Sequence, residues 1–243
     1  KRKGKTRRII MLVPMRAILD AADKNGYAQG AFNVNAVCQV KAAVDVHQIL
    51  RSPAIIQGAD LANGFMGGRT DFANSTLEDK KAGAKNIGAA VKKYAADSDI
   101  PVALHLDHGK NFDSCIAAIE GGYTSVMIDG SSLPFDENVE LTREVVKYAH
   151  ERGVTVEGEL GVLAGVEDHV FAATSTYTNP LSAIDFFKKT GVDALAISYG
   201  TMHGANKGKN AVIRKEIAIA IKECMLHEGI EGYLVSHGSS TVP

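Results

Sequence analysis

Two histidines and an aspartate stand close together in "HLDHG", residues 105–109, at the end of the apolar run "PVALHLDHG". Imidazoles bind metal ions, and both imidazoles and carboxylates move protons, so this stretch could serve a metal site, acid–base catalysis or both. Polar side chains follow other apolar runs in the same manner: Asn33, Glu157, Glu159, His203 and His237. This pattern predicts one polar site assembled from the ends of several strands.

Three of these histidines, His108, His203 and His237, follow three different apolar runs. Three imidazoles can hold Zn²⁺ through ring nitrogens and leave a fourth position open for substrate, which is a catalytic geometry. The set contains no thiolate, so zinc is the first choice, although cobalt or iron tolerates the same ligands. Strand alternation would point Asp107 and His108 to opposite sides unless the backbone turns where the run ends.

Four other histidines have ordinary structural explanations. Alternation places His105 on the face of Asp107, where we expect it in the core or in support of the site. His47, His150 and His227 lie in helical stretches, where we expect packing or surface roles.

Short apolar runs alternate with helix-like segments from about residue 29 onward. This rhythm is typical of βα units around a parallel sheet. The predicted strands span residues 29–34, 53–59, 101–107, 124–129, 154–160, 194–199 and 233–237. Amphipathic helices are predicted over residues 14–26, 138–153 and 214–229, each ending at a glycine that can adopt a left-handed conformation.

Eight βα units close a (β/α)8 TIM barrel, an α/β fold whose active sites lie at the carboxyl ends of its strands. This chain ends after its seventh predicted strand. We interpret it as a TIM barrel lacking its last strand and helices, because an open sheet would expose the edges of its first and seventh strands. The alternative is an open seven-stranded sheet. We expect a basic arm over residues 1–13 and a C-terminally incomplete barrel domain over residues 14–243.

The composition of the chain argues against a highly charged partner. With a net charge of −1 and 45% hydrophobic residues, the chain can fill a large core but does not generally attract nucleic acid or anionic membranes. The basic run "KRKGKTRR" is interpreted as a solvated arm, with nucleic-acid binding or targeting as the alternative. The apolar run "IIMLV" is too short for a signal peptide or membrane span. We therefore expect a soluble, cytoplasmic protein.

Five segments at predicted strand ends form a longer pattern: "GAFNVN", "PVALHLDHG", "VEGELGVLAGVED", "YGTMHGANKG" and "VSHGSS". Together they resemble the motifs of the class II, metal-dependent fructose-bisphosphate aldolases, in the family's order. The resemblance covers nearly the whole chain from about residue 14. A single HxDH motif would be weak evidence, whereas five ordered segments are specific.

The resemblance implies a zinc-dependent enzyme that reversibly cleaves fructose 1,6-bisphosphate to dihydroxyacetone phosphate and glyceraldehyde 3-phosphate. It implies that His108, His203 and His237 bind the zinc ion and that Glu159 approaches it. Cleavage leaves an enediolate on the three-carbon ketone fragment and needs an electrophile at the C2 oxygen. A metal fits this need better than a lysine Schiff base, because no lysine stands in the middle of a predicted strand.

The resemblance also assigns two proton carriers. Asp107 takes the proton from the C4 hydroxyl as the bond breaks. Glu167, on the loop after the fifth strand, exchanges the proton at C3. Two carboxylates in separate environments can serve two separate proton transfers.

Substrate binding is implied for a further set of residues. Asn33 touches the substrate, and Gly204, Lys207, Gly238 and Ser240 bind a phosphate or an accompanying monovalent cation. Glycine-rich segments expose backbone N–H groups that favour anions in any fold.

Three alternative functions remain open at this level. A tagatose 1,6-bisphosphate aldolase would share these motifs, because the two sugars differ only in configuration at C4. A metal-dependent hydrolase on a TIM barrel is less favoured, because its usual HxH on the first strand is missing from "GAFNV". A binding or scaffold protein would not need the intact polar set. The resemblance further implies a homo-oligomer, a dimer or larger.

Overall fold

The computed structural model describes residues 11–162, 165–167, 170–172, 176–204 and 212–242. The chain forms two compact units. The first contains residues up to 107 together with 117–125, and the second contains residues 108–116 together with those from 126 onward. The boundary between the units therefore falls inside the strand that ends in "HLDHG".

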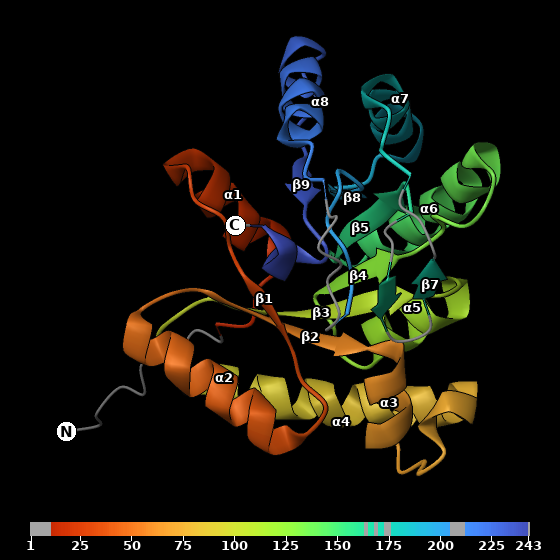
Figure 1. Ribbon diagram of the computed structural model, residues 1–243. Coiled ribbons are helices and arrows are strands. Elements are labelled where there is room, and N and C mark those ends of the chain that lie inside the picture. Colours follow the sequence, from red (N-terminus) through yellow and green to blue (C-terminus); the bar gives the residue numbers. More distant parts are fainter. Residues whose placement is uncertain (1–10, 163–164, 168–169, 173–175, 205–211, 243) are drawn as a thin grey trace. The chain divides into compact units, whose positions relative to one another are not determined.

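The first unit consists of parallel strands with helices packed against them (Figure 1). Its strands, in spatial order, are β1 (Ala31–Asn33), β2 (Ala54–Ala59) and most of β3 (Val102–Gly109). Its helices are α1 (Met15–Asn25), α2 (Val37–Leu50), α3 (Asp60–Met66), α4 (Leu77–Ala96) and the 3-10 helix η1 (Phe72–Asn74). Helix α5 (Phe112–Glu120) belongs partly to each unit.

Two strands of the first unit, β2 and β3, are buried, whereas all three residues of β1 are exposed. Every residue of β2 and of β3 is buried, as parallel strands with both faces covered require. Helix α1 packs Met15 and Ile18 against Ile55 of β2 and Ala103 of β3. This packing holds β3 in place up to the residues where its polar end begins.

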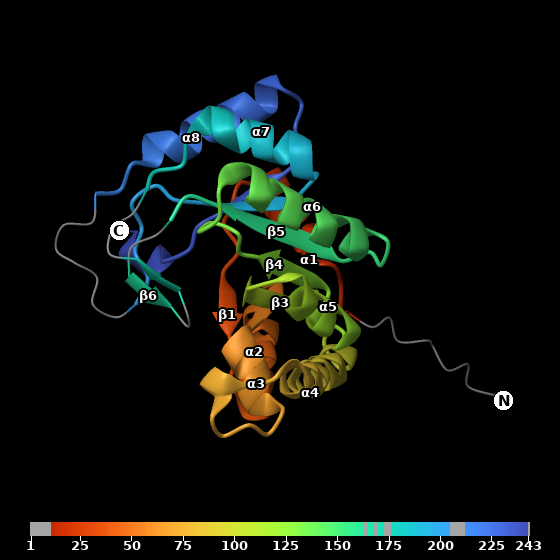
Figure 2. The ribbon, with the colours of Figure 1, turned by 90° about the vertical axis from the view of Figure 1, so that its right-hand side faces the viewer.

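The second unit repeats the arrangement. Its strands, in spatial order, are β4 (Ser125–Ile128), β5 (Thr155–Leu160), β8 (Ala194–Ile197) and β9 (Tyr233–Val235). Its helices are α6 (Phe135–His150), α7 (Pro180–Thr190), α8 (Lys215–His227) and the 3-10 helix η2 (Ser239–Thr241). Strands β6 (Gly165–Glu167) and β7 (Val170–Ala172) form a separate antiparallel pair. Figure 2 shows α6 along β5, and α7 packs against both α6 and α8.

The α/β class and the parallel pairing predicted from the sequence are confirmed. All seven predicted strands are present within two residues of their predicted ends, whereas the short β6–β7 pair was not predicted. Closure into an eight-stranded barrel stays a prediction.

The predicted helices correspond to α1, α6 and α8. Helix α6 begins at Phe135, three residues before the predicted start, because its acidic first turn extends the helix toward Pro134. The predicted terminal glycines Gly26, Gly153 and Gly229 all have positive φ. Among the described residues, no helix combines the length and the apolar character needed to cross a lipid bilayer.

Candidate metal centre

The second unit brings together His108, His203 and His237. One ring nitrogen from each lies within 4.8 Å of the other two. The ring centroid of His108 lies 5.5 Å from that of His203 and 4.7 Å from that of His237. The centroids of His203 and His237 are 5.9 Å apart. The His108 and His203 residues are 4% and 3% exposed. Three imidazoles with little solvent exposure at this spacing form a donor set that suits zinc.

A turn in the backbone allows His108 to reach this cluster. Its φ is 47°, in the left-handed region, although it lies within β3. In a regular strand, adjacent side chains point to opposite faces. The left-handed conformation of His108 breaks that alternation at the strand end. This is the backbone turn without which Asp107 and His108 would point to opposite sides.

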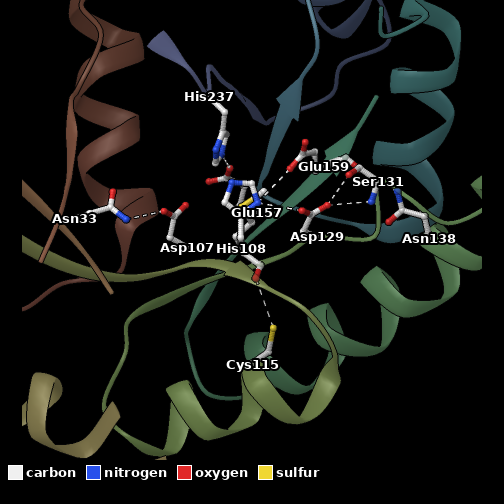
Figure 3. Close-up of polar contacts among 11 residues, drawn as sticks. Asn33, Asp107, His108, Cys115, Asp129, Ser131, Asn138, Glu157, Glu159 and His237 are labelled. Carbon is white, nitrogen blue, oxygen red and sulfur yellow. Dashed lines mark hydrogen bonds and ion pairs between the residues drawn. The ribbon is translucent and has the colours of Figure 1, made fainter. Parts of the chain in front are cut away.

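A carboxylate fixes the orientation of His108. Its Nδ1 lies 3.0 Å from Oδ2 of Asp129 (Figure 3). Ser131 donates to the other oxygen of Asp129 from its backbone N–H at 3.1 Å and from its hydroxyl at 2.6 Å. Burial alone would raise the pKa of Asp129, but the hydrogen bond and charge of His108 and the two hydrogen bonds from Ser131 outweigh burial and hold the pKa at about 2. The carboxylate is therefore ionised, and Nε2 of His108 is the nitrogen that would coordinate a metal.

A second carboxylate does the same for His237. Its Nε2 lies 2.9 Å from Oε1 of Glu157, so Nδ1 is the nitrogen that would face a metal. Burial lowers the pKa of His237, but the hydrogen bond to Glu157 and the charge of that carboxylate outweigh burial and raise it above its ordinary value. Carboxylate partners of this kind orient metal-binding imidazoles and increase their basicity.

The loops that carry His203 and His237 are tied together by Thr241. Its Oγ1 accepts from the backbone N of Met202 at 3.2 Å and contacts the carbonyl oxygens of Met202 and Gly238 at 3.1 and 2.7 Å. Gly238 has a φ of 61°, and a Cβ there would lie 2.4 Å from the Met202 oxygen. This close approach of backbones requires glycine beside His237.

Glu159 adds a further buried carboxylate. Its Oε2 lies 3.6 Å from Nδ1 of His108, and the side chain is 2% exposed. Burial, followed by the charge of Asp129, raises the pKa of Glu159 to about 8. Oxygens of Glu159 and Asp129 and a nitrogen of His108 also lie within 4.8 Å of one another. Several buried acidic groups around three imidazoles fit a divalent cation, which would offset their charge.

In the first unit, Asn33 and Asp107 form a hydrogen-bonded pair. Nδ2 of Asn33 donates to Oδ2 of Asp107 at 2.7 Å, and Asp107 is 1% exposed (Figure 3). The β2 residue paired with Asp107 is Ala59. The amide on β1 therefore reaches across β2 to a carboxylate on β3. Asp107 directly precedes His108 in the chain.

The other predicted site residues are placed less fully. Gly204 is exposed with a φ of 84°, and Ser240 is exposed on η2. Glu167 is the last residue of β6, and only its backbone is described. Lys207 lies outside the described residues.

The histidines expected to be structural contact other partners. His105 is buried with Nδ1 2.8 Å from the Ser125 hydroxyl, and His47 packs edge-on against Phe32. His150 pairs with Asp193 at 2.9 Å, and His227 is exposed.

Two residues of the cluster were missed in the sequence analysis. Asp129 was predicted only as the last residue of a strand, and Glu157 was noted at a strand end without a role. The signal that could have found them is their position: Asp129 directly follows β4, whose neighbour β3 carries His108, and Glu157 lies in β5, whose neighbour β8 precedes His203.

Comparison with known proteins gives consistent matches. A sequence model of the family described as fructose-bisphosphate aldolase class-II matches residues 13–243. The chain is 44% identical to a fructose-bisphosphate aldolase from Treponema pallidum (strain Nichols), over 96% of this chain and 70% of that protein. It is 39% identical to one from Staphylococcus aureus (strain Mu50), over 96% and 74%. It is similar to the solved structure of the YdjI aldolase from Escherichia coli K12, with a TM-score of 0.74 and 27% identity over 96% and 75%.

Proposed function

Because the chain belongs to the class II fructose-bisphosphate aldolase family, we propose that it is a zinc-dependent aldolase. The proposed reaction is the reversible cleavage of fructose 1,6-bisphosphate to dihydroxyacetone phosphate and glyceraldehyde 3-phosphate. The observation that carries the proposal is the buried cluster of His108, His203 and His237 with its carboxylate partners.

The proposed zinc ligands are the three imidazoles, with Glu159 close enough to approach the ion. A bound zinc ion supplies a Lewis acid that polarises a substrate carbonyl. Asp129 and Glu157 hold the imidazoles of His108 and His237 in the orientation that coordination requires. A Schiff-base mechanism has less support, because none of the described strands contains a lysine.

Asp107 is the proposed acceptor of the proton from the C4 hydroxyl. As the C3–C4 bond breaks, its electron pair stays on the ketone fragment and the C4 oxygen becomes the aldehyde oxygen. The hydrogen bond from Asn33 holds one oxygen of Asp107, which fixes the direction of the other toward a substrate. Burial excludes the water that would compete for the proton.

The remaining roles rest on the family. Glu167 is proposed to return the proton to C3. Gly204, Lys207, Gly238 and Ser240 are proposed to bind phosphate, with a monovalent cation nearby, and Asn33 to touch the substrate. The positive φ values of Gly204 and Gly238 are compatible with backbone N–H groups turned toward an anion.

The wider proposals also follow from the family. They are a basic arm over residues 1–13, one barrel domain over residues 14–243, a cytoplasmic location and a homo-oligomer. A sugar bisphosphate is the proposed partner.

The decisive experiment is retro-aldol cleavage of fructose 1,6-bisphosphate, coupled to detection of triose phosphate, before and after EDTA treatment and zinc add-back. Loss of activity on chelation with recovery on zinc supports the proposal. Activity that is indifferent to chelation would overturn the metal mechanism. Faster cleavage of tagatose 1,6-bisphosphate would move the assignment to that sugar, and inactivity on both with metal-dependent hydrolysis would favour a hydrolase.

A further inference from the structure

Asn138 is a buried amide that contacts two strand ends of the metal cluster. It lies in the first turn of α6 and is 1% exposed. Its Nδ2 donates to the backbone carbonyl of Glu159 at 2.8 Å (Figure 3). The amide therefore holds the main chain from which the Glu159 carboxylate projects.

The other end of the same amide contacts the segment that carries Asp129. A Cβ built on Gly130 would lie 2.3 Å from Oδ1 of Asn138 and 2.8 Å from its Cγ. The backbone of Gly130 thus rests directly on the amide, between Asp129 and Ser131. Because Asp129 and Gly130 are consecutive, the Asn138 side chain limits where the Asp129 carboxylate can lie.

Thr142 determines which way the amide faces. Its hydroxyl, one helical turn later on α6, donates to Oδ1 of Asn138 at 3.2 Å, and Thr142 is 0% exposed. An amide whose oxygen accepts from Thr142 must present its NH₂ group to the carbonyl of Glu159. The pair of Asn138 and Thr142 therefore forms a fixed connection between α6 and β5.

We propose that Asn138 is a positioning residue for the metal centre. It sets the separation of the Asp129 and Glu159 carboxylates, which lie 3.0 and 3.6 Å from Nδ1 of His108. His108 must be correctly oriented to bind zinc, and the two carboxylates orient it. The zinc affinity therefore depends on Asn138, although Asn138 itself contacts no ligand nitrogen. This inference rests on the proposed zinc site.

The expected size of the effect can be estimated from residues that contact a metal ligand directly. Removing a group that directly orients a metal ligand costs about 10- to 100-fold in metal affinity. Asn138 acts through two such groups, so we expect Asn138→Ala to raise the zinc dissociation constant about tenfold. Thr142→Val, which removes only the hydroxyl that orients the amide, should give a smaller rise in the same direction.

The experiment compares the zinc dissociation constants of the wild-type chain, N138A, T142V and N63A by competition with a chelator. The matched control is Asn63, a 2% exposed amide on α3 in the first unit whose Oδ1 accepts from the Tyr123 hydroxyl at 2.7 Å. Thermal unfolding of each zinc-free protein is measured in parallel. A merely structural role would lower the unfolding temperature of N138A and N63A alike and leave zinc binding unchanged.

Weaker zinc binding by N138A and T142V with unchanged binding by N63A supports the inference. Equal zinc affinity in the wild type, N138A and T142V overturns it and leaves the proposed function standing. A wild-type chain that binds no zinc overturns both. Where N138A does not fold, as judged by circular dichroism, T142V decides by the same criterion.

Discussion

At the scale of single residues, the site depends on carboxylates that act through imidazoles. Asp129 contacts Nδ1 of His108 and Glu157 contacts Nε2 of His237, so each ring has one nitrogen engaged. Asp107 differs from both, because it accepts a hydrogen bond from the neutral amide of Asn33. Asp129 and Glu157 thus each hold a ring, whereas Asp107 is the acid proposed for proton transfer.

Asp107→Asn tests the proposed role of Asp107 in proton transfer. The change removes the proton acceptor while keeping the size of the side chain, so kcat for fructose 1,6-bisphosphate cleavage should fall about 10²- to 10⁴-fold. Zinc content should be unchanged, because the proposed ligands are the imidazoles. Steady-state kinetics and metal analysis check both statements, with Asp45→Asn in an exposed ion pair as the control. Near-normal kcat in D107N would remove Asp107 from the chemistry.

Glu157→Gln tests the role of a carboxylate that holds an imidazole ring. The neutral amide loses the charge that makes His237 a stronger ligand, so the zinc dissociation constant should rise about 10- to 100-fold. Chelator competition measures it. The control is Glu140→Gln, an exposed partner of Arg143 on α6, which should bind zinc as the wild type does. An unchanged constant in E157Q would mean that His237 does not bind the ion.

The residue types of the site could be predicted, but their contacts could not. Histidines at strand ends are rare enough to be noticed, so His108, His203 and His237 were predicted as one set. A carboxylate in the same position looks like any solvated strand end, so Asp129 and Glu157 received no role. Only the folded chain shows which of them meets a ring.

At the scale of elements, the sequence "EGE" in β5 places a different kind of residue on each face of the strand. Glu157 and Glu159 are two residues apart and therefore share a face of the strand. Gly158 points the other way, where a Cβ would lie 3.0 Å from the Phe186 ring and 3.4 Å from the Thr142 methyl. The glycine lets α6 and α7 pack closely against β5.

Gly158→Ala should therefore destabilise the protein by overpacking. We expect a loss of about 1–3 kcal/mol in the free energy of unfolding, measured by urea denaturation of the zinc-free protein. Phe186→Leu should relieve the contact, so the double variant should be more stable than the sum of the two single effects predicts. Strict additivity would show that the Phe186 contact is not the cause.

Elements with strong local signals were the ones the sequence predicted well. Strands β2 and β3 are buried along their whole length and begin with apolar runs, which are visible in the sequence. Strands β6 and β7 have three residues each and, in the described part of the chain, pair with one another. Strands β1 and β9 are equally short, but they continue the alternation of apolar runs and helices along the chain. Strands β6 and β7 do not, so their pairing depends on the folded context.

At the scale of the whole molecule, all three proposed zinc ligands lie in the second unit. Zinc binding should therefore stabilise that unit selectively. At a zinc concentration of 100 times the dissociation constant, the gain is about 2.7 kcal/mol for the structure that binds the ion. Hydrogen exchange with mass spectrometry should show slower exchange on zinc addition in β5, β8 and β9, and a smaller change in β1 and β2.

The control for this experiment is the variant His203→Ala, in which zinc should slow exchange in neither unit. Equal protection of β1 and β2 in the wild type would contradict the prediction and show that the two units unfold as one.

The left-handed conformation of His108 has a consequence for how this position can change in evolution. Glycine would relieve the backbone strain, which is roughly 1–2 kcal/mol for a residue with a side chain, but it would remove the imidazole. Asparagine and aspartate adopt this conformation at less cost than most other side chains, but neither carries an imidazole. No other residue combines an imidazole with an unstrained left-handed backbone, so we expect changes of the site to occur at its neighbours rather than at this position.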